Sequence, residues 1–363
     1  MTGKPLDVTQ TTLLKGVGIL AIVAHNFQYL VSDLPGVNEF VFEKENFDRF
    51  LSGLTLLSFP RLFLAFFGHY GVQLFIFLSA YGLTLSFQKR VPSYGPFVLA
   101  RLQRLYPAFV LAIVAWALWK GVPRGPMGPV DQVIEHGPSV LLKLTLFSNL
   151  VRGEQLSLVG PWWFLPFIFQ FYLLFPLLFR LPTRGLAVVG TLGLALTFAL
   201  NETVLPGGFV LATPLGHLPE FCVGIWWAKH PGARVPGALT VVALLTFVAG
   251  NLEAHAWYLS HLCVLTLGLA SWPFVSRVLV PVQKPLLVIG GLSMQLFLVN
   301  GFMRSPLFEW ARVDGTELAA GAWGLTSFAL CFYAAMLLRW LEGKLPLHAA
   351  TKDESTQTGV PPP

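Results

Sequence analysis

Two ionisable side chains, Lys15 and His25, stand in the first long apolar stretch of the chain, LLKGVGILAIVAHNF. Ionisable groups at membrane depth are costly and usually face a bundle interior or a watery cavity. On one helix they would lie about 15 Å apart along the axis and about 80° apart around it, so one inward-facing stripe can hold both. A histidine there can accept a hydroxyl proton near neutral pH. The simpler interpretation is a snorkelling lysine and a histidine hydrogen-bonded to a neighbouring helix.

A buried carboxylate, Glu220, is the natural partner for such a base. Counted inwards along its own predicted helix it lies about 13 Å deep, a depth similar to that of His25. His217 precedes it by three residues on the same helix face, so a His25–Glu220 or a His217–Glu220 pair is expected. Gln73 and Gln170 lie at comparable depths and could donate hydrogen bonds to a developing oxyanion. Polar contacts between helices would explain the two glutamines equally well.

Two arginines, Arg101 and Arg104 in RLQR, share one face at the predicted cytoplasmic start of a helix. Guanidinium pairs suit phosphate groups because their contacts are planar and charge-assisted. Ordinary cytoplasmic anchoring of a membrane helix is the alternative. Lys15 could add a third charge to the same site.

Trp162 and Trp163 lie at a predicted outer interface. An aromatic belt would explain them, and a stacking platform for a sugar is the sharper alternative. His69 is placed close to the outer surface, where a histidine can be solvated. Other residues that could line a cavity are Ser79, His255, His261 and Asn300.

The amino-acid composition indicates whether the protein folds in water or in a membrane. Of 363 residues, 55% are hydrophobic and 12% are charged, which is too little charge to cover a soluble domain of this length. We therefore predict an all-α polytopic membrane protein that contacts lipid. The net charge of +6 is scattered among loops and does not indicate nucleic-acid binding. The three cysteines lie singly in apolar runs, so no disulfide framework and no metal site is predicted.

Ten stretches are long and apolar enough to be membrane spans, and two weaker stretches at 50–67 and 139–151 fit interfacial or re-entrant helices better. With a cytoplasmic N-terminus, 15 of the 24 basic residues fall inside, which predicts that both termini are cytoplasmic. We expect a transmembrane domain over 1–345 and a disordered cytoplasmic tail over 346–363. The predicted spans cover about 12–32, 66–87, 103–120, 160–180, 185–203, 211–229, 236–252, 256–276, 286–304 and 318–339.

Several segments in order along the chain resemble the membrane-bound acyltransferase 3 family. After the lysine and histidine of the first helix come GVQLFIFLSAYG and RLQRLYP; PWWFLPFIFQFYLLFPLLF, PEFCVGIWWA and LLVIGGLSMQLFLVNGF follow. The resemblance covers about 12 to 340. The chain departs from the family pattern at Lys15, usually arginine; at Ala80, usually glycine; and at Asn300, usually histidine.

The resemblance implies an integral membrane O-acyltransferase that takes an acyl group, such as acetyl, from cytoplasmic acyl-CoA. Arg101, Arg104 and Lys15 would bind the donor, and no permanently bound cofactor is implied. His25 would be the general base, or a transient acyl carrier, with Glu220 as a further catalytic residue. The acceptor would be a hydroxyl of a glycan or lipid-linked saccharide. Residues for binding substrate are Gln73, Ser79, Trp162, Trp163 and Gln170.

The expected location is the cell membrane, as a multi-pass protein of a bacterial inner membrane. A proton-coupled transporter or flippase is the main alternative, since buried histidine and glutamate suit a proton relay. Inverted repeats with broken helices would favour it, and none is evident in the sequence. A receptor or scaffold would leave the buried polar residues unexplained.

Overall fold

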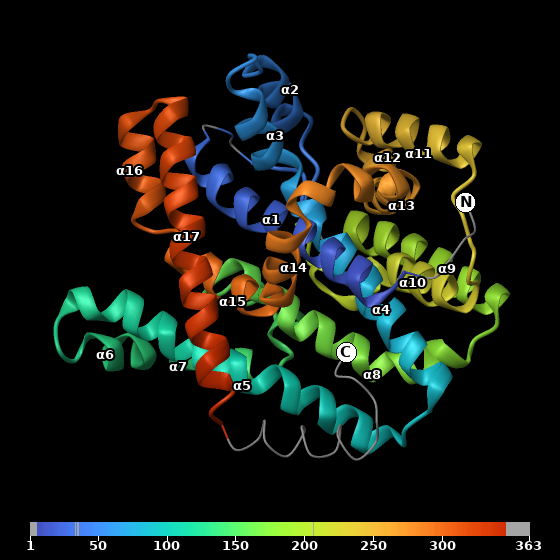
Figure 1. Ribbon diagram of the computed structural model, residues 1–363, viewed down its shortest axis with the longest axis horizontal. Coiled ribbons are helices and arrows are strands. Elements are labelled where there is room, and N and C mark those ends of the chain that lie inside the picture. The colour runs from blue at the N-terminus through green and yellow to red at the C-terminus, as the bar shows by residue number, and fades with distance from the viewer. Residues whose placement is uncertain (1–5, 33, 35, 206, 346–363) are drawn as a thin grey trace.

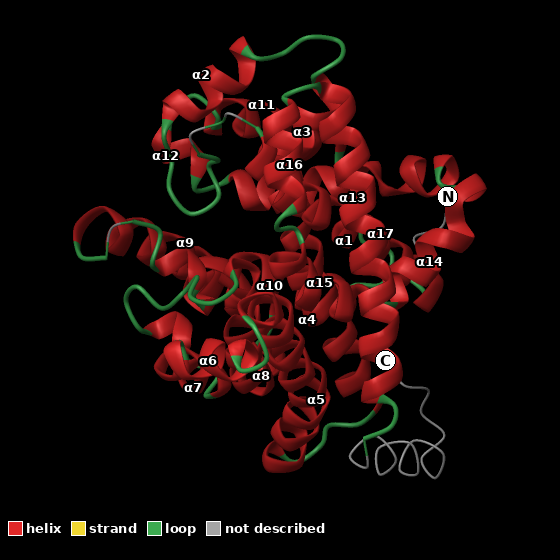
Figure 2. Cartoon of the chain, turned by 90° about the vertical axis from the view of Figure 1, so that its left-hand side faces the viewer, coloured by secondary structure: helices red, strands yellow, loops and turns green. Residues whose placement is uncertain are grey.

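The computed structural model describes residues 6–32, 34, 36–205 and 207–345. Helices and short connecting loops make up this part of the chain, and it contains no strand (Figure 2). The predicted all-α class is confirmed. The tail predicted over 346–363 lies outside the described residues.

Seventeen α-helices follow one another along the described chain, with short 3₁₀ turns between some of them (Figure 1). Three turns bear on the site: η1 (Gly68–Tyr70), η4 (Gly160–Trp163) and η6 (Pro214–His217). The helices are α1 (Val8–Val31), α2 (Lys44–Ser52), α3 (Phe59–Phe67), α4 (Gly71–Lys89), α5 (Tyr94–Gly121), α6 (Gly128–Glu135), α7 (Gly137–Leu144), α8 (Phe164–Arg180), α9 (Thr183–Thr203), α10 (Leu218–Lys229), α11 (Gly237–Gly250), α12 (Ala254–Trp257), α13 (Ser260–Val278), α14 (Gln283–Gly291), α15 (Ser293–Met303), α16 (Leu307–Asp314) and α17 (Glu317–Glu342).

Seven helical stretches of the described chain are long and apolar enough to cross a membrane, or eight if one bent pair counts as a span. The predicted count of ten is therefore not confirmed, and the cytoplasmic placement of the termini stays a prediction. The seven are Val8–Val31, Phe59–Lys89, Tyr94–Arg124, Gly160–Arg180, Thr183–Thr203, Ser260–Val278 and Glu317–Glu342.

Three of the ten predicted spans are not among these seven. The one over 211–229 begins with a 3₁₀ turn and leaves α10 only 12 residues, while α11 has 14 residues, too few for a span. The one over 286–304 is bent by 76° between α14 and α15. The weak stretch at 50–67 was predicted to be interfacial or re-entrant. In the structure its helix α3 continues through η1 into α4, and together they form one of the seven apolar stretches.

Helix α1 lies in the middle of the molecule and packs against α3, α4, α14 and α15 (Figure 1). A capping box between Asp7 and Gln10 fixes its first turn. The close approach of α1 to its neighbouring helices depends on glycines, as is common between membrane helices. A methyl group added to Gly71 would lie 2.5 Å from the Gly18 carbonyl oxygen of α1. The first helix is thereby held directly against the second long apolar stretch.

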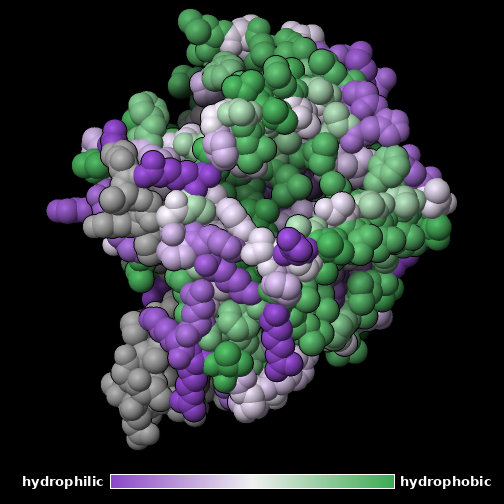
Figure 3. All heavy atoms as spheres, turned by 90° about the vertical axis from the view of Figure 1, so that its right-hand side faces the viewer, coloured by the Kyte–Doolittle hydropathy of each residue, from purple (hydrophilic) through white to green (hydrophobic). Residues whose placement is uncertain are grey.

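Much of the outer surface is apolar, as expected for a protein in contact with lipid. Helices α9 and α11 expose rows of large aliphatic side chains, and Figure 3 shows a broad apolar area on the side of the molecule where these helices lie. Polar residues buried inside the bundle are consequently the exception that needs a reason. The exposed residues include Val188, Leu192, Leu196, Val241, Val242, Leu245 and Val248.

The contact between α1 and α14 generates a stability prediction. A methyl group at Gly290 would lie 2.1 Å from the Thr12 carbonyl oxygen of α1, whereas one at the neighbouring Gly291 would meet nothing within 4 Å. We expect Gly290→Ala to destabilise the protein by about 1–3 kcal/mol through overpacking. Gly291→Ala should be neutral or slightly stabilising, since alanine is the better helix former. Thermal unfolding in detergent measures both, and equal midpoints would contradict the packing described here.

Candidate functional site

His25 lies in α1 with its side chain inside the protein, 4% exposed. Its Nδ1 is 2.8 Å from the carbonyl oxygen of Ala65, in the last turn of α3. A carbonyl oxygen can only accept, so Nδ1 carries the hydrogen and the lone pair of the neutral ring is on Nε2. Gly68 allows this approach, because a methyl group there would lie 2.6 Å from the Ala21 carbonyl oxygen and 2.8 Å from Cβ of His25. The histidine therefore has a fixed orientation and one nitrogen able to accept a proton.

The carboxylate nearest to this nitrogen is Glu39, whose Oε2 is 3.9 Å from Nε2. The loop that carries Glu39 is anchored on both sides: the Trp257 indole donates to the Asn38 carbonyl at 2.9 Å, and Phe40 packs edge-to-face on Trp163. The expected His25–Glu220 pair is not among the ion pairs of the described chain. Glu39 lies in the loop between α1 and α2, and no sequence pattern marks it as a residue that folds back onto His25.

A small cavity lies beside these residues, with room for about one water molecule. His69 lines this cavity and packs edge-to-face on His25, with ring centroids 5.3 Å apart. His69 is 3% exposed, not solvated as the sequence suggested, and neither of its nitrogens makes a hydrogen bond of good geometry in the described chain. The cavity is lined by Glu39, Phe40, His69, Val72, Gln73, Trp163, His217 and His261.

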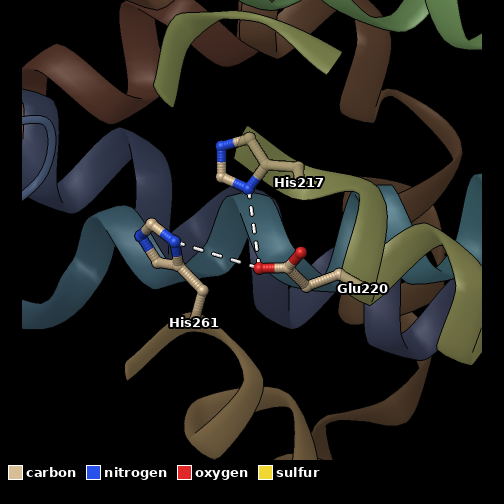
Figure 4. A group of neighbouring side chains, drawn as sticks. All are labelled: His217, Glu220 and His261. Atoms are coloured by element: carbon tan, nitrogen blue, oxygen red, sulfur yellow. Dashed lines mark ion pairs between the residues drawn. The ribbon is translucent and has the colours of Figure 1, made fainter. Parts of the chain in front are cut away.

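A second buried group, formed by His217, Glu220 and His261, borders the same cavity. Nδ1 of His217 is 3.6 Å and Nδ1 of His261 is 3.9 Å from one oxygen of Glu220 (Figure 4). The three side chains come from η6, α10 and the first turn of α13. The predicted His217–Glu220 pair is thus present, with His261 added from a distant part of the chain.

His255 lies outside this group. It is exposed and pairs with Glu253 at 2.5 Å. The hydrogen bond from His255, with a second from the Ala256 amide, lowers the pKa of Glu253 to about 2. The pair is a surface cap of α12, not part of the cavity.

The predicted donor residues come together at the other end of α1 from His25. Lys15 and Arg104 lie close enough to repel each other, and Arg101 likewise interacts with Arg104. The guanidinium of Arg101 lies over the rings of Phe97 and Tyr172, 5.3 and 5.8 Å from their centroids. Three cations from α1 and α5 thus form one basic group.

Both predicted tryptophans are buried inside the bundle, so an aromatic belt at the interface is the wrong interpretation. Trp162 is fully buried, and its indole donates to the Leu298 carbonyl at 2.9 Å, which makes it a core residue. Trp163 lines the cavity and stacks on His217 with ring centroids 6.2 Å apart.

Of the other polar residues expected to bind substrate, one lines the cavity and two do not. Gln73 lines the cavity, and its Oε1 is buried with no hydrogen-bond partner in the described chain. Gln170 donates to Leu146 and exchanges hydrogen bonds with Asn149, so it joins helices and loops instead of facing a substrate. Ser79 is half-buried in α4 and is not one of the cavity residues.

Two of the departures from the family pattern have local explanations. The methyl of Ala80 faces Gly224, where any side chain would come within 2.7 Å, so a glycine on α10 supplies the space lost on α4. Asn300 accepts a hydrogen bond at 2.7 Å from Asn26, the residue after His25, and donates to two carbonyls of its own helix. It therefore helps to position α1 through hydrogen bonds alone.

Comparison with known proteins identifies the family of the chain. Residues 10–340 match the family model described as an acyltransferase domain, Acyl_transf_3. No curated protein and no solved structure matches the chain significantly.

Proposed function

The chain belongs to the acyltransferase 3 family, and from that premise we propose that it moves a short acyl group, such as acetyl, from cytoplasmic acyl-CoA to a hydroxyl of a glycan or lipid-linked saccharide. That it is an acyltransferase of a membrane follows from the family and the apolar helices. The donor, the acceptor and the roles of individual residues are the proposal. We place it in the cell membrane of a bacterium.

One observation carries the assignment of the base. The hydrogen bond from Nδ1 of His25 to the Ala65 carbonyl leaves the lone pair on Nε2, beside the Glu39 carboxylate. A general base needs a fixed orientation and a free lone pair, and His25 has both. Glu39 would stabilise the imidazolium that forms when the base takes a proton.

The acyl group would pass directly from the donor to the acceptor. Nε2 of His25 takes the proton of the acceptor hydroxyl while that oxygen forms a bond to the thioester carbonyl carbon. The tetrahedral intermediate collapses, the carbon–sulfur bond breaks, and the proton passes to the coenzyme A thiolate. The products are an ester and free coenzyme A. Gln73, which lines the adjoining cavity, would donate a hydrogen bond to the oxyanion.

The donor and the acceptor would bind near opposite ends of α1. The basic group of Lys15, Arg101 and Arg104 would hold the phosphates of the donor, which a cluster of cations favours. His25 lies ten residues further along α1, about 15 Å away. An extended acyl-CoA would span this length with its thioester towards His25. Of the acceptor, only the reacting hydroxyl would fit in the cavity, which has room for about one water molecule and has Trp163 in its wall.

Removal of the base should abolish turnover. We expect His25→Ala and His25→Asn each to lower the rate about 10²–10⁴-fold, because proton transfer by a positioned base is lost. Asparagine keeps a donor that can reach Ala65, so it separates the base from the hydrogen bond. The rate is followed as free coenzyme A released by proteoliposomes given labelled acetyl-CoA and a glycan acceptor. His255→Ala, which removes an exposed imidazole, is the control. Full turnover by folded His25→Asn would refute the assignment.

Weakening the basic group should mainly raise the KM of the donor. Arg101→Ala is expected to raise the donor KM about tenfold, the effect of one charge-assisted contact, with a smaller kcat change. The increase should shrink at high salt, because screening weakens the wild-type contact. Arg180→Ala, which removes an exposed cation on α8, should leave KM unchanged. An unaltered KM in Arg101→Ala would contradict donor binding and indicate that Arg101 only anchors its helix at the membrane surface.

A further inference from the structure

We propose that His217, Glu220 and His261 bind a divalent transition-metal ion of the Zn²⁺ class at the edge of the cavity. Two imidazoles and one carboxylate from separate elements converge, and all their nearest ligand atoms lie within 4.8 Å of one another. Figure 4 shows both rings directed at the same carboxylate oxygen. Nitrogen and carboxylate oxygen are the donors that zinc and its neighbours prefer.

The hydrogen bonding of His217 shows why the group needs a cation. Its Nε2 is 3.0 Å from the Leu211 carbonyl oxygen, so Nε2 carries the hydrogen and the neutral ring has its lone pair on Nδ1. That lone pair faces a carboxylate oxygen 3.6 Å away. Glu39 beside His25 is 26% exposed and can be hydrated, whereas the side chains of His217 and Glu220 are 3% and 2% exposed. Two acceptors that face each other without water repel unless a positive charge lies between them. A backbone carbonyl that holds the far nitrogen of a histidine is also the usual support for a metal ligand.

The spacing of the donors suits an ion between them. Zinc binds nitrogen and carboxylate oxygen at about 2.0–2.2 Å, so two ligands of one ion lie up to about 4.2 Å apart. The distances of 3.6 and 3.9 Å from Glu220 to the two histidines fall within this limit. They exceed a hydrogen bond of normal length, which is 2.7–3.2 Å. Only the distance between the two histidine nitrogens needs a small rotation.

Burial adds an energetic reason. Glu220 is 1% exposed, His217 3% and His261 5%. The second oxygen of Glu220 and Nδ1 of His217 are buried and make no hydrogen bond in the described chain. A buried carboxylate beside neutral imidazoles is strongly unfavourable, whereas a bound dication compensates it.

The surroundings leave a coordination position free on the cavity side. His217 and His261 both line the cavity, as do His69, Gln73 and Glu39. Three protein ligands with an open fourth position are the arrangement of a catalytic metal site, where the ion holds water or substrate. An ion here could bind an acceptor oxygen close to His25 without replacing it as the base.

Metal content tests the site without any acyl donor, so the result is independent of the proposed reaction. The full-length protein, purified in detergent with an affinity tag free of histidine, is analysed by mass spectrometry for bound metal. It is then stripped with a chelator and titrated with Zn²⁺ and with Co²⁺. We expect about one ion per chain, visible Co²⁺ absorption bands and a raised thermal midpoint with Zn²⁺.

Variants locate the ion. Glu220→Gln and His261→Asn should each lose the bound metal and the Co²⁺ bands, while remaining monodisperse in size-exclusion chromatography. His255→Ala removes the exposed histidine that pairs with Glu253 and should keep both. The proposal is overturned if the folded wild-type protein binds no ion at micromolar Zn²⁺. It is equally overturned if Glu220→Gln retains the metal or if His255→Ala loses it.

Discussion

The hydrogen bond from His25 to the Ala65 carbonyl determines what the buried imidazole can do. It fixes the ring and leaves Nε2 beside Glu39, and it exists because α1 passes close to the end of α3. Gly68 and Gly71 make that approach possible, since any side chain there would collide with α1. The chemistry proposed for the protein therefore depends on how α1 packs against α3, η1 and the start of α4, where glycines allow the close contact.

Burial of ionisable groups is the constraint that organises the rest of the site. Charged groups inside an apolar bundle are unfavourable unless each has a partner. The described chain meets this requirement in different ways at the two ends of α1. Around the small cavity, histidines are grouped with Glu39 and Glu220, and we propose a metal ion as the positive charge beside Glu220. At the other end, aromatic rings cover Arg101, and the cations would be neutralised by donor phosphates.

Much of this could be predicted from the sequence, where local pattern determines structure. Long apolar stretches identified the membrane class, and the three-residue spacing of His217 and Glu220 predicted their contact. The features that the sequence did not predict depend on contacts between residues far apart along the chain. Glu39 reaches His25 through a loop held by Trp257, and His261 joins Glu220 from 41 positions away. The bend between α14 and α15 and the burial of Trp162 likewise come from packing that no single segment encodes.

The most direct test concerns the protonation of His25 itself. Nitrogen-15 NMR of histidine-labelled protein in bilayers distinguishes the two neutral forms of each ring, and His25→Asn identifies the signals of residue 25. For the neutral ring, in the absence of substrate, we predict hydrogen on Nδ1 and a lone pair on Nε2, as the contact with Ala65 requires. Hydrogen on Nε2 with a bare Nδ1 would contradict both the observed hydrogen bond and the role of His25 as the base.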